Sequence, residues 1–277
     1  MSIPKAAAGD FVGRYREIVS DPLNLCIARV EQAGTIAEGL VVLHNGHRVP
    51  FRGPGAYYGS FSDILIINRG VHEPLEEFVF QEVLKRLPDA PIMVELGAYW
   101  AHYSMWLLQK RPEGRVIMVE PGDEERRAGE ANFQRHGYRG TFIAAKVGAE
   151  NLTIDQLIRD QRLSHVSILH SDIQGYEVQM LAGATETLST GKVDNIFIST
   201  HSQHLHATCA HKLTGFGYRV EAAADFLTET TSHDGFIFAR RANLPPIFRD
   251  FQPLGRQAIM AAAPVVLRNS ILNRVPE

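Results

Sequence analysis

Cysteine is scarce in this sequence, and long apolar runs are missing. The two cysteines, Cys26 and Cys209, lie far apart and lack the spacing of a metal site, so no disulfide framework is expected and a reducing cytoplasm fits. No apolar stretch approaches the roughly 20 residues that span a bilayer. The N-terminal segment MSIPKAAAGDFVGRYREIV also lacks the apolar core of a secretory signal. We therefore expect a soluble, cytoplasmic protein.

An excess of charge of either sign is also missing. The formal net charge is −3, and charged residues make up 21% of the 277 residues. This balance gives no electrostatic reason to expect nucleic acid or an anionic membrane as a partner. Hydrophobic residues make up 45%, enough for the core of one large domain or of a domain with a smaller attachment. The partner therefore has to be inferred from motifs.

Residues 1–74 are mixed in character and predict an N-terminal cap or substrate-side subdomain. The strand-like segment 39–51 contains Asn45-Gly46, a dipeptide typical of a hairpin turn. Residues 63–70, DILIINRG, also have the composition of a strand. Residues 73–87 place apolar side chains three and four positions apart, which predicts an amphipathic helix.

A second domain is predicted over residues 75–241, where strand-like and helix-like segments alternate. Such alternation is typical of right-handed βαβ units in a mostly parallel sheet with helices on both faces. The proline-interrupted extension 242–277 is expected to pack on this domain or on the second subunit of a homodimer. The seven expected strands are 91–96, 115–120, 142–148, 166–172, 195–200, 217–223 and 234–241, and the expected helices between them are 102–111, 123–137, 176–189 and 204–217.

Polar residues end four of these predicted strands. In an open parallel sheet, ligands bind beyond the carboxyl ends of the strands. Charged residues at the ends of buried strands do not contribute to the packing of the core, so we expect a functional site at this edge of the sheet. The residues are Glu95 and Gly97 after the first strand, Glu120 and Pro121 after the second, Asp172 after the fourth and His201 after the fifth.

The first of these loops, VELGAYWAHYS, distinguishes between cofactors. A dinucleotide needs the glycines of G-x-G-x-x-G, and only Gly97 is present, which disfavours an NAD-dependent dehydrogenase. A carboxylate at Glu95 would repel phosphate and attract a cationic amino-acid group. Glu120 is placed to accept hydrogen bonds from a ribose diol. The pattern favours a nucleoside with a positive amino-acid tail, such as S-adenosylmethionine (SAM); a tight turn beside a surface acid is the structural alternative.

Four segments resemble the FkbM family of SAM-dependent methyltransferases in order and spacing, across about residues 91–190. They are VELGAYWAHYSMWL, VIMVEPGDEERRAGEANFQRHGY, FIAAKVGAENLTIDQLI and LHSDIQGYEVQMLAGA. The segments FISTHSQHLHATC and SHDGFIFARR extend the resemblance to about residue 240. The resemblance implies a seven-stranded, Rossmann-like class I methyltransferase fold.

The resemblance also implies a set of cofactor contacts. Glu95 and Gly97 would lie against the methionine end of SAM, and Glu120 would lie on the ribose. The turn 146–148 would lie near the adenine. The cofactor-binding residues expected on this basis are Glu95, Gly97, Tyr99, Glu120, Pro121, Lys146, Val147 and Asp172.

Asp172 belongs to the segment ILHSDIQGYE, in which Asp172, Gly175 and Glu177 match the acid, glycine and acid of the family. Capping of the following helix by Asp172, with Glu177 complementing its dipole, accounts for the two acids. It does not account for His170 on the same face of the strand, nor for His201 at the end of the adjacent strand.

Methyl transfer to a hydroxyl requires a group that takes the hydroxyl proton. A histidine near its normal pKa can take it. A divalent metal such as Mg²⁺, held by carboxylates, can instead lower the pKa of the hydroxyl. The expected catalytic residues are Asp172, His201, His170 and His233, and the expected ligands of a metal, if one is used, are Asp172, His201 and Asp234.

The sequence thus predicts a SAM-dependent methyltransferase that acts on a hydroxyl of a small natural product or sugar. One alternative keeps the fold and methylates an amine or a carboxylate. Another is a non-catalytic SAM-binding or assembly subunit.

Overall fold

The computed structural model describes residues 10–57, 59–227, 231, 233–249, 251–263, 265–267 and 269. These residues form two compact units. The first unit comprises the described residues within Met1–Lys85, Ala224–His233 and Asp250–Glu277. The second comprises Arg86–Ala223 and the described residues within Asp234–Arg249. The division at 85/86 lies about ten residues beyond the predicted end of the cap, and the predicted domain limits at 74 and 241 stay predictions.

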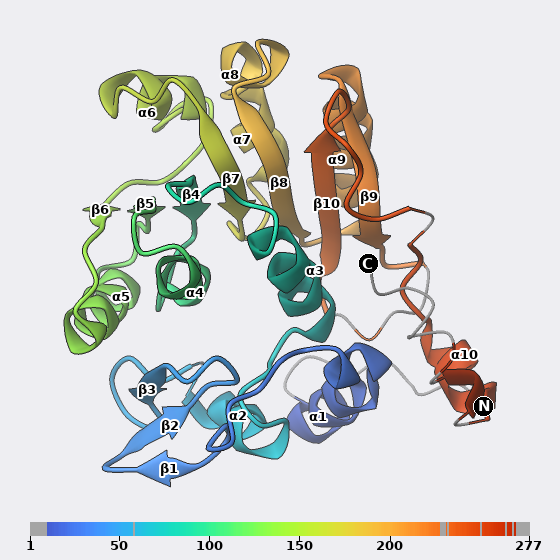
Figure 1. The fold of residues 1–277 in the computed structure, drawn as a ribbon. Helices are drawn as coiled ribbons and strands as arrows, with labels where there is room; N and C mark the ends of the chain where they lie inside the picture. Colours follow the sequence, from blue (N-terminus) through green and yellow to red (C-terminus); the bar gives the residue numbers. More distant parts are fainter. Residues whose placement is uncertain are drawn as a thin grey trace. The chain divides into compact units, whose positions relative to one another are not determined.

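The second unit is built on a seven-stranded sheet with the order β6-β5-β4-β7-β8-β10-β9 (Figure 1). Each pair of neighbouring strands from β6 to β8 is parallel, and β10 runs antiparallel to β8. This arrangement confirms the predicted fold class. The strands are β4 (Ile92–Leu96), β5 (Arg115–Val119), β6 (Thr141–Ile143), β7 (Val166–Ser171), β8 (Val193–Thr200), β9 (Tyr218–Ala224) and β10 (Gly235–Arg241).

Helices cover both faces of this sheet because successive strand residues point to opposite sides. On one face, Val94 and Leu96 of β4 join a core with side chains of four helices. On the other face, α5 meets the sheet, where Phe133 packs edge-on against Phe142. The helices of the first face are α6 (Ile154–Asp160), α7 (Glu177–Ala182), α8 (Thr185–Ser189) and α9 (Gln203–Gly215), and the other helices of this unit are α4 (His102–Lys110) and α5 (Asp123–His136).

The helix predicted over 176–189 is divided into α7 and α8 at Gly183. A Cβ on Gly183 would lie 3.1 Å from the Cβ of Thr153, so the chain passes close to the start of α6. The Gly183 carbonyl accepts a hydrogen bond from the backbone N–H of Asp155 at 2.9 Å. The Asp155 carboxylate in turn accepts from the backbone N–H groups of Glu186 and Thr187 at the start of α8. These contacts satisfy the backbone at the break, and the sequence pattern of the segment does not reveal them.

The first unit contains a small antiparallel sheet and several short helices. Strands β2 (Leu40–Val42) and β3 (Arg48–Pro50) pair across a turn that contains Gly46 at φ 96°, which confirms the predicted hairpin. Helix α3 (Pro74–Leu84) confirms the predicted helix, with Pro74 at its first position, but all of its residues are buried, so it has no exposed polar face. The remaining elements are α1 (Phe11–Ser20), η1 (Pro22–Leu25), β1 (Ile36–Ala37), η2 (Gly59–Ser62), α2 (Asp63–Ile67) and α10 (Arg256–Ala261).

The strand predicted at 63–70 is wrong, because Asp63–Ile67 forms helix α2. A short apolar run does not distinguish a strand from a buried helix by periodicity. Ile64 and Leu65 are buried side by side while Ile67 is 52% exposed, a pattern that an alternating strand does not give. The backbone N–H of Asn68 donates to the carbonyl of Ile64 at 2.8 Å, which closes the helical turn.

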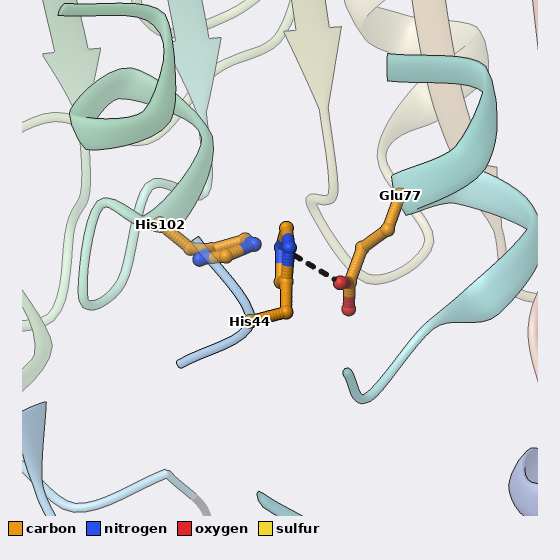
Figure 2. Close-up of side chains that lie close together, drawn as sticks. All are labelled: His44, Glu77 and His102. Atoms are coloured by element: carbon orange, nitrogen blue, oxygen red, sulfur yellow. Dashed lines mark ion pairs between the residues drawn. The ribbon is translucent and has the colours of Figure 1, made fainter. Parts of the chain in front are cut away.

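A buried cluster of one carboxylate and two histidines joins α3 to the β2–β3 hairpin within the first unit; burial lowers the pKa of His44, whereas the charge of Glu77 outweighs burial and raises the pKa of His72. Glu77 Oε2 lies 3.0 Å from His44 Nε2, and neither side chain is exposed (Figure 2). Glu77 Oε1 lies 2.8 Å from His72 Nδ1 and also accepts the backbone N–H groups of His72 and Glu73. One carboxylate therefore ties together three segments of this unit.

The C-terminal segment contributes to the first unit through Phe251, which stacks on Phe78 of α3 with ring centroids 5.9 Å apart. The final residues 270–277 lie outside the described part of the chain. None of the described helices combines the length and hydropathy that a bilayer crossing requires.

Candidate active site

The polar residues that follow the strands of the second unit lie at one edge of its sheet. The loops after β4 and β7 touch there, since the backbone N–H of Asp172 donates to the carbonyl of Leu96 at 2.9 Å. Gly97 has φ 69°, and a Cβ on it would lie 1.8 Å from the carbonyl oxygen of Asp172. Only glycine fits this position, because both the backbone conformation and the space exclude a side chain.

Glu95 lies inside the sheet and is 2% exposed. Its Oε2 accepts the backbone N–H of Ser104 at 3.1 Å, so the carboxylate caps the first turn of α4. Burial raises the pKa of Glu95, while the nearby His170 and the hydrogen bonds from α4 lower it. The side chain thereby fixes the helix that follows the loop, and its predicted contact with SAM stays a prediction.

The loop between β4 and α4 holds an unusual backbone without further glycines. Tyr99 has φ 45° and Ala101 has φ 61°, in the left-handed region that costs a non-glycine residue about 1–2 kcal/mol. The side chain of Asn132 on α5 donates to the carbonyl of Trp100 at 3.0 Å. Contacts of this kind hold the strained loop in place, and strain of this kind is typical of ligand-binding loops.

Glu120 follows β5 and connects two loops. Its Oε2 accepts the backbone N–H of Tyr99 at 3.1 Å, and its Oε1 accepts the backbone N–H of Gly122 at 2.9 Å. Burial raises the pKa of Glu120, and these two hydrogen bonds lower it. Each carboxylate oxygen keeps a second lone pair, so Glu120 can also accept hydrogen bonds from a ribose diol.

The turn after β6 lies at the same edge of the sheet as these loops. Val147 is buried and forms an isolated bridge with Leu152, while Lys146 is exposed. The Lys146 carbonyl accepts the backbone N–H of Leu152 at 3.1 Å. Pro121, beside Glu120, is exposed. These contacts fix the backbone of the turn, as a support for an adenine would require. The roles predicted for Lys146, Val147 and Pro121 stay predictions.

Asp172, His201 and Glu177 form a continuous chain of contacts. The Nε2 atom of His201 lies 3.4 Å from Asp172 Oδ1, and its Nδ1 atom lies 2.5 Å from Glu177 Oε1. The Glu177 side chain is fully buried, whereas 22% of His201 and 32% of Asp172 are exposed. These three contacting side chains therefore extend from the protein interior to the open edge of the sheet, with Glu177 innermost and Asp172 outermost.

His201 is held in its protonated form by the carboxylates around it. Burial lowers its pKa, but hydrogen bonds to Asp172 and Glu177 and the charge of Asp234 outweigh burial and raise the pKa to about 10. Asp234 stands one residue before the Gly235–Thr200 pair of β10 and β8, opposite His201. At neutral pH the imidazole is a cation, so both ring nitrogens carry a proton.

His170 and His233 occupy different surroundings from His201. His170 is 3% exposed, pairs in register with Glu95, and has its ring 4.3 Å from that of Tyr103. It lies within β7, two residues before Asp172. His233 belongs to the first unit and is half-buried. The geometry of the second unit thus brings together Asp172 and His201, and the catalytic roles of His170 and His233 stay predictions.

The magnesium ligands predicted at Asp172, His201 and Asp234 stay a prediction. A metal would have to displace the proton from one nitrogen of His201, and both nitrogens face carboxylates. Within the described part of the chain, these three residues do not bring their ligand atoms within 4.8 Å of one another. The imidazolium of His201 already supplies a positive charge among the carboxylates.

The sequence interpretation left Glu177 out of the site. The sequence pattern predicts this acid as a complement to the helix dipole, and Glu177 does open α7. The available signal was its place in the acid, glycine and acid pattern of residues 172–177. Its pairing with His201 requires the positions of β7 and β8 in the sheet.

Several solved structures are similar to parts of this chain at low sequence identity. Precorrin-6y C5,15-methyltransferase from Geobacter metallireducens is 16% identical over 59% of this chain and 87% of that chain, with a TM-score of 0.45. M. capricolum TrmK in complex with S-adenosyl-homocysteine is 12% identical over 71% of this chain and 82% of that chain, with a TM-score of 0.42. The bifunctional kinase-methyltransferase WbdD is 12% identical over 63% of this chain and 40% of that chain, with a TM-score of 0.43.

The comparison of sequences with protein families is more specific. No curated protein matches the chain significantly. A model described as the methyltransferase FkbM domain matches residues 73–220, which is more than half of the 277 residues. This match includes β4 to β8 with all their carboxyl-end loops, and it confirms the resemblance seen in the motifs. The chain belongs to the FkbM family of SAM-dependent methyltransferases.

Proposed function

We propose that this methyltransferase acts on a neutral hydroxyl of a small molecule, such as a natural product or a sugar. The observation that carries the proposal is the position of Asp172. Its backbone touches the Gly97 turn, and its carboxylate lies at the open edge of the sheet with His201 on one oxygen. An acceptor bound there would lie between the cofactor loops and a carboxylate.

The second unit offers a chemically suitable set of groups for SAM. Glu120 would accept the ribose hydroxyls with its remaining lone pairs, and the turn at Lys146 and Val147 would support the adenine. The loop of Gly97 and Tyr99 would hold the methionine end, beside the buried carboxylate of Glu95. When bound, SAM supplies a methyl group on a positively charged sulfur, which makes that methyl group electrophilic.

Asp172 would take the proton of the acceptor hydroxyl. As the new C–O bond forms, the hydroxyl oxygen becomes positively charged and its proton becomes strongly acidic. A carboxylate is then a sufficient acceptor. His201 would hold one oxygen of Asp172 and so direct the other toward the acceptor. Alignment of the acceptor and exclusion of water supply the rest of the catalysis.

The local charge supports a neutral acceptor. Asp172, Glu177 and Asp234 surround a single imidazolium, so carboxylates outnumber cations in this part of the site. An acceptor carboxylate would meet repulsion there. The same excess of carboxylates also attracts cations, such as a protonated amine. Methylation of an amine would therefore change the proposal from O- to N-methylation.

The proposal is tested by Asp172→Asn in the full-length protein. We expect binding of S-adenosylhomocysteine, measured by calorimetry, to change by less than about threefold, because the variant keeps the backbone beside Gly97. Transfer of labelled methyl groups from SAM to a panel of hydroxyl compounds should fall by about 10²–10⁴-fold, the usual contribution of a positioned proton acceptor.

Three results would contradict the proposal. Turnover of a hydroxyl acceptor at an unchanged rate in Asp172→Asn would remove the assigned role of Asp172. Turnover that disappears with EDTA and returns with Mg²⁺ would show that a metal performs the step instead. Exclusive methylation of amines or carboxylates in the same panel would replace the hydroxyl as the acceptor class.

A further inference from the structure

We propose that Glu177 is a positioning residue that fixes the ring of His201 and, through it, the carboxylate of Asp172. Only the expected effect of Glu177 on catalysis rests on the proposed function. The positioning itself is a property of the folded protein and has its own measurement.

The contacts of Glu177 are unlike those of an ordinary helix-capping acid. Its side chain is fully buried, although it opens a helix of six residues. Its Oε1 atom lies 2.5 Å from Nδ1 of His201, a short charge-assisted hydrogen bond. A buried carboxylate is costly unless it is paired, and His201 provides the pairing charge.

The same oxygen also fixes the loop that carries Asp172. Glu177 Oε1 accepts the backbone N–H of Gly175 at 2.9 Å. This loop has two consecutive left-handed residues, Gln174 at φ 49° and Gly175 at φ 100°. The left-handed conformation is unfavourable for Gln174, so the loop depends on contacts of this kind. Glu177 thus connects the loop after β7 to the residue after β8.

The backbone of His201 is fixed independently of Glu177. Thr200 ends β8 in register with Gly235, and Ser202 caps α9 by accepting the backbone N–H of Leu205 at 3.2 Å. The orientation of the imidazole ring remains to be set by its hydrogen bonds. With Nδ1 held by Glu177, Nε2 faces Asp172, and a rotation of the ring would break both contacts.

If Glu177 only stabilised the helix dipole, its substitution would leave the ring of His201 unchanged. If Glu177 positions that ring, its substitution changes the hydrogen bond at His201 Nδ1. Glu186 offers a matched control, because it is also an acid in the first turn of a short helix, α8. Its carboxylate is 55% exposed and pairs with Arg159 on the surface. Glu186→Gln removes a first-turn charge without touching the chain of contacts at Asp172.

The experiment uses ¹⁵N-histidine-labelled protein of full length, saturated with S-adenosylhomocysteine. We expect a downfield ring N–H resonance from His201, assigned by its absence in His201→Asn. The resonance should persist in Glu186→Gln, move upfield in Glu177→Gln because a neutral amide is a weaker acceptor, and disappear in Glu177→Ala. Glu177→Gln keeps the size of the side chain, so the test remains available if Glu177→Ala does not fold.

The kinetic arm follows the same variants with a hydroxyl acceptor. We expect kcat to fall by about 10- to 100-fold in Glu177→Gln, the effect of a slightly misplaced group, with KM for SAM unchanged. A His201 resonance that is identical in wild type and Glu177→Gln would overturn the proposal whatever the activity. The expected shift in a protein that methylates no hydroxyl would support the positioning and overturn only the proposed function.

Discussion

At the scale of single residues, the tightest contact of the site joins Gly97 to the backbone of Asp172. The Gly97 backbone has φ 69°, and the space where a side chain would begin is filled by a carbonyl oxygen at 1.8 Å. The loops after β4 and β7 therefore press directly on each other. Any change at residue 97 must displace Asp172 as well as the cofactor loop.

We expect Gly97→Ala to damage both stability and activity. The left-handed conformation costs an alanine about 1 kcal/mol, and the clash with the Asp172 carbonyl adds to this cost. Urea denaturation should show a loss of at least about 2 kcal/mol, and binding of S-adenosylhomocysteine should weaken. Gly137→Ala is the matched control, since Gly137 has the same φ of 69° with open space around it. Equal losses in both variants would refute the role of the clash.

The sequence identified several site residues from their positions alone. Asp172 and His201 each follow an apolar run, and parallel strands bring such positions to one edge. The protonated state of His201 was not predictable from the sequence, because it depends on Glu177 and Asp234, which adjoin it only after β7, β8 and β10 have paired. A histidine proposed as a base thus lies in an environment that keeps its proton.

At the scale of elements, the first unit depends on the carboxylate of Glu77. The strand pairing of the hairpin and the apolar face of α3 are predictable from the sequence, whereas the ion pairs that join them are not. Residues 44, 72 and 77 follow no common period, and their contacts arise from the path of the chain between them. The wrong prediction of a strand at 63–70 has a related cause. A short apolar run can form a strand or a buried helix, and the choice depends on contacts with the rest of the protein.

Glu77→Ala should destabilise the protein by about 3–5 kcal/mol, as expected when one partner of a buried ion pair is removed. The change would leave two buried imidazoles and the backbone N–H groups of His72 and Glu73 without their acceptor. Denaturation followed by circular dichroism measures the loss. Glu38→Ala, at an exposed acid of the same unit, should change stability by less than about 0.5 kcal/mol. A loss under about 1 kcal/mol in Glu77→Ala would show that the cluster does not stabilise this unit.

At the scale of the whole molecule, the number of strands in the sheet and their mostly parallel arrangement were predictable from the sequence. Alternating strands and helices of ordinary length allow few topologies, and the family motifs select one of them. The break between α7 and α8 was less predictable, since it depends on Asp155 of a different helix. Overall architecture follows from repeated local patterns, while such exceptions follow from single long-range contacts.

The charge on His201 makes the stability of the protein depend on pH in a defined range. Because its folded pKa is raised above the ordinary 6.5 to about 10, its stabilising contribution is complete below about pH 6.5. The contribution is lost as the pH rises from there through about 10. Denaturation at a series of pH values should show a steeper alkaline loss of stability in the wild type than in His201→Gln. Parallel curves would mean that His201 loses its proton at a similar pH in the folded and unfolded states.

The antiparallel direction of β10 has a consequence for how such enzymes diversify. Every parallel strand from β4 to β8 presents its last residues to the active edge, but β10 presents its first, so Asp234 lies at that edge directly before β10. Insertions or exchanges between β9 and β10 would alter the part of the edge beside Asp234, where the proposed acceptor would bind, and leave the loops after β4 and β5 untouched. Selection for a new acceptor can therefore act on one connection of the sheet while the machinery for the methyl donor is inherited unchanged.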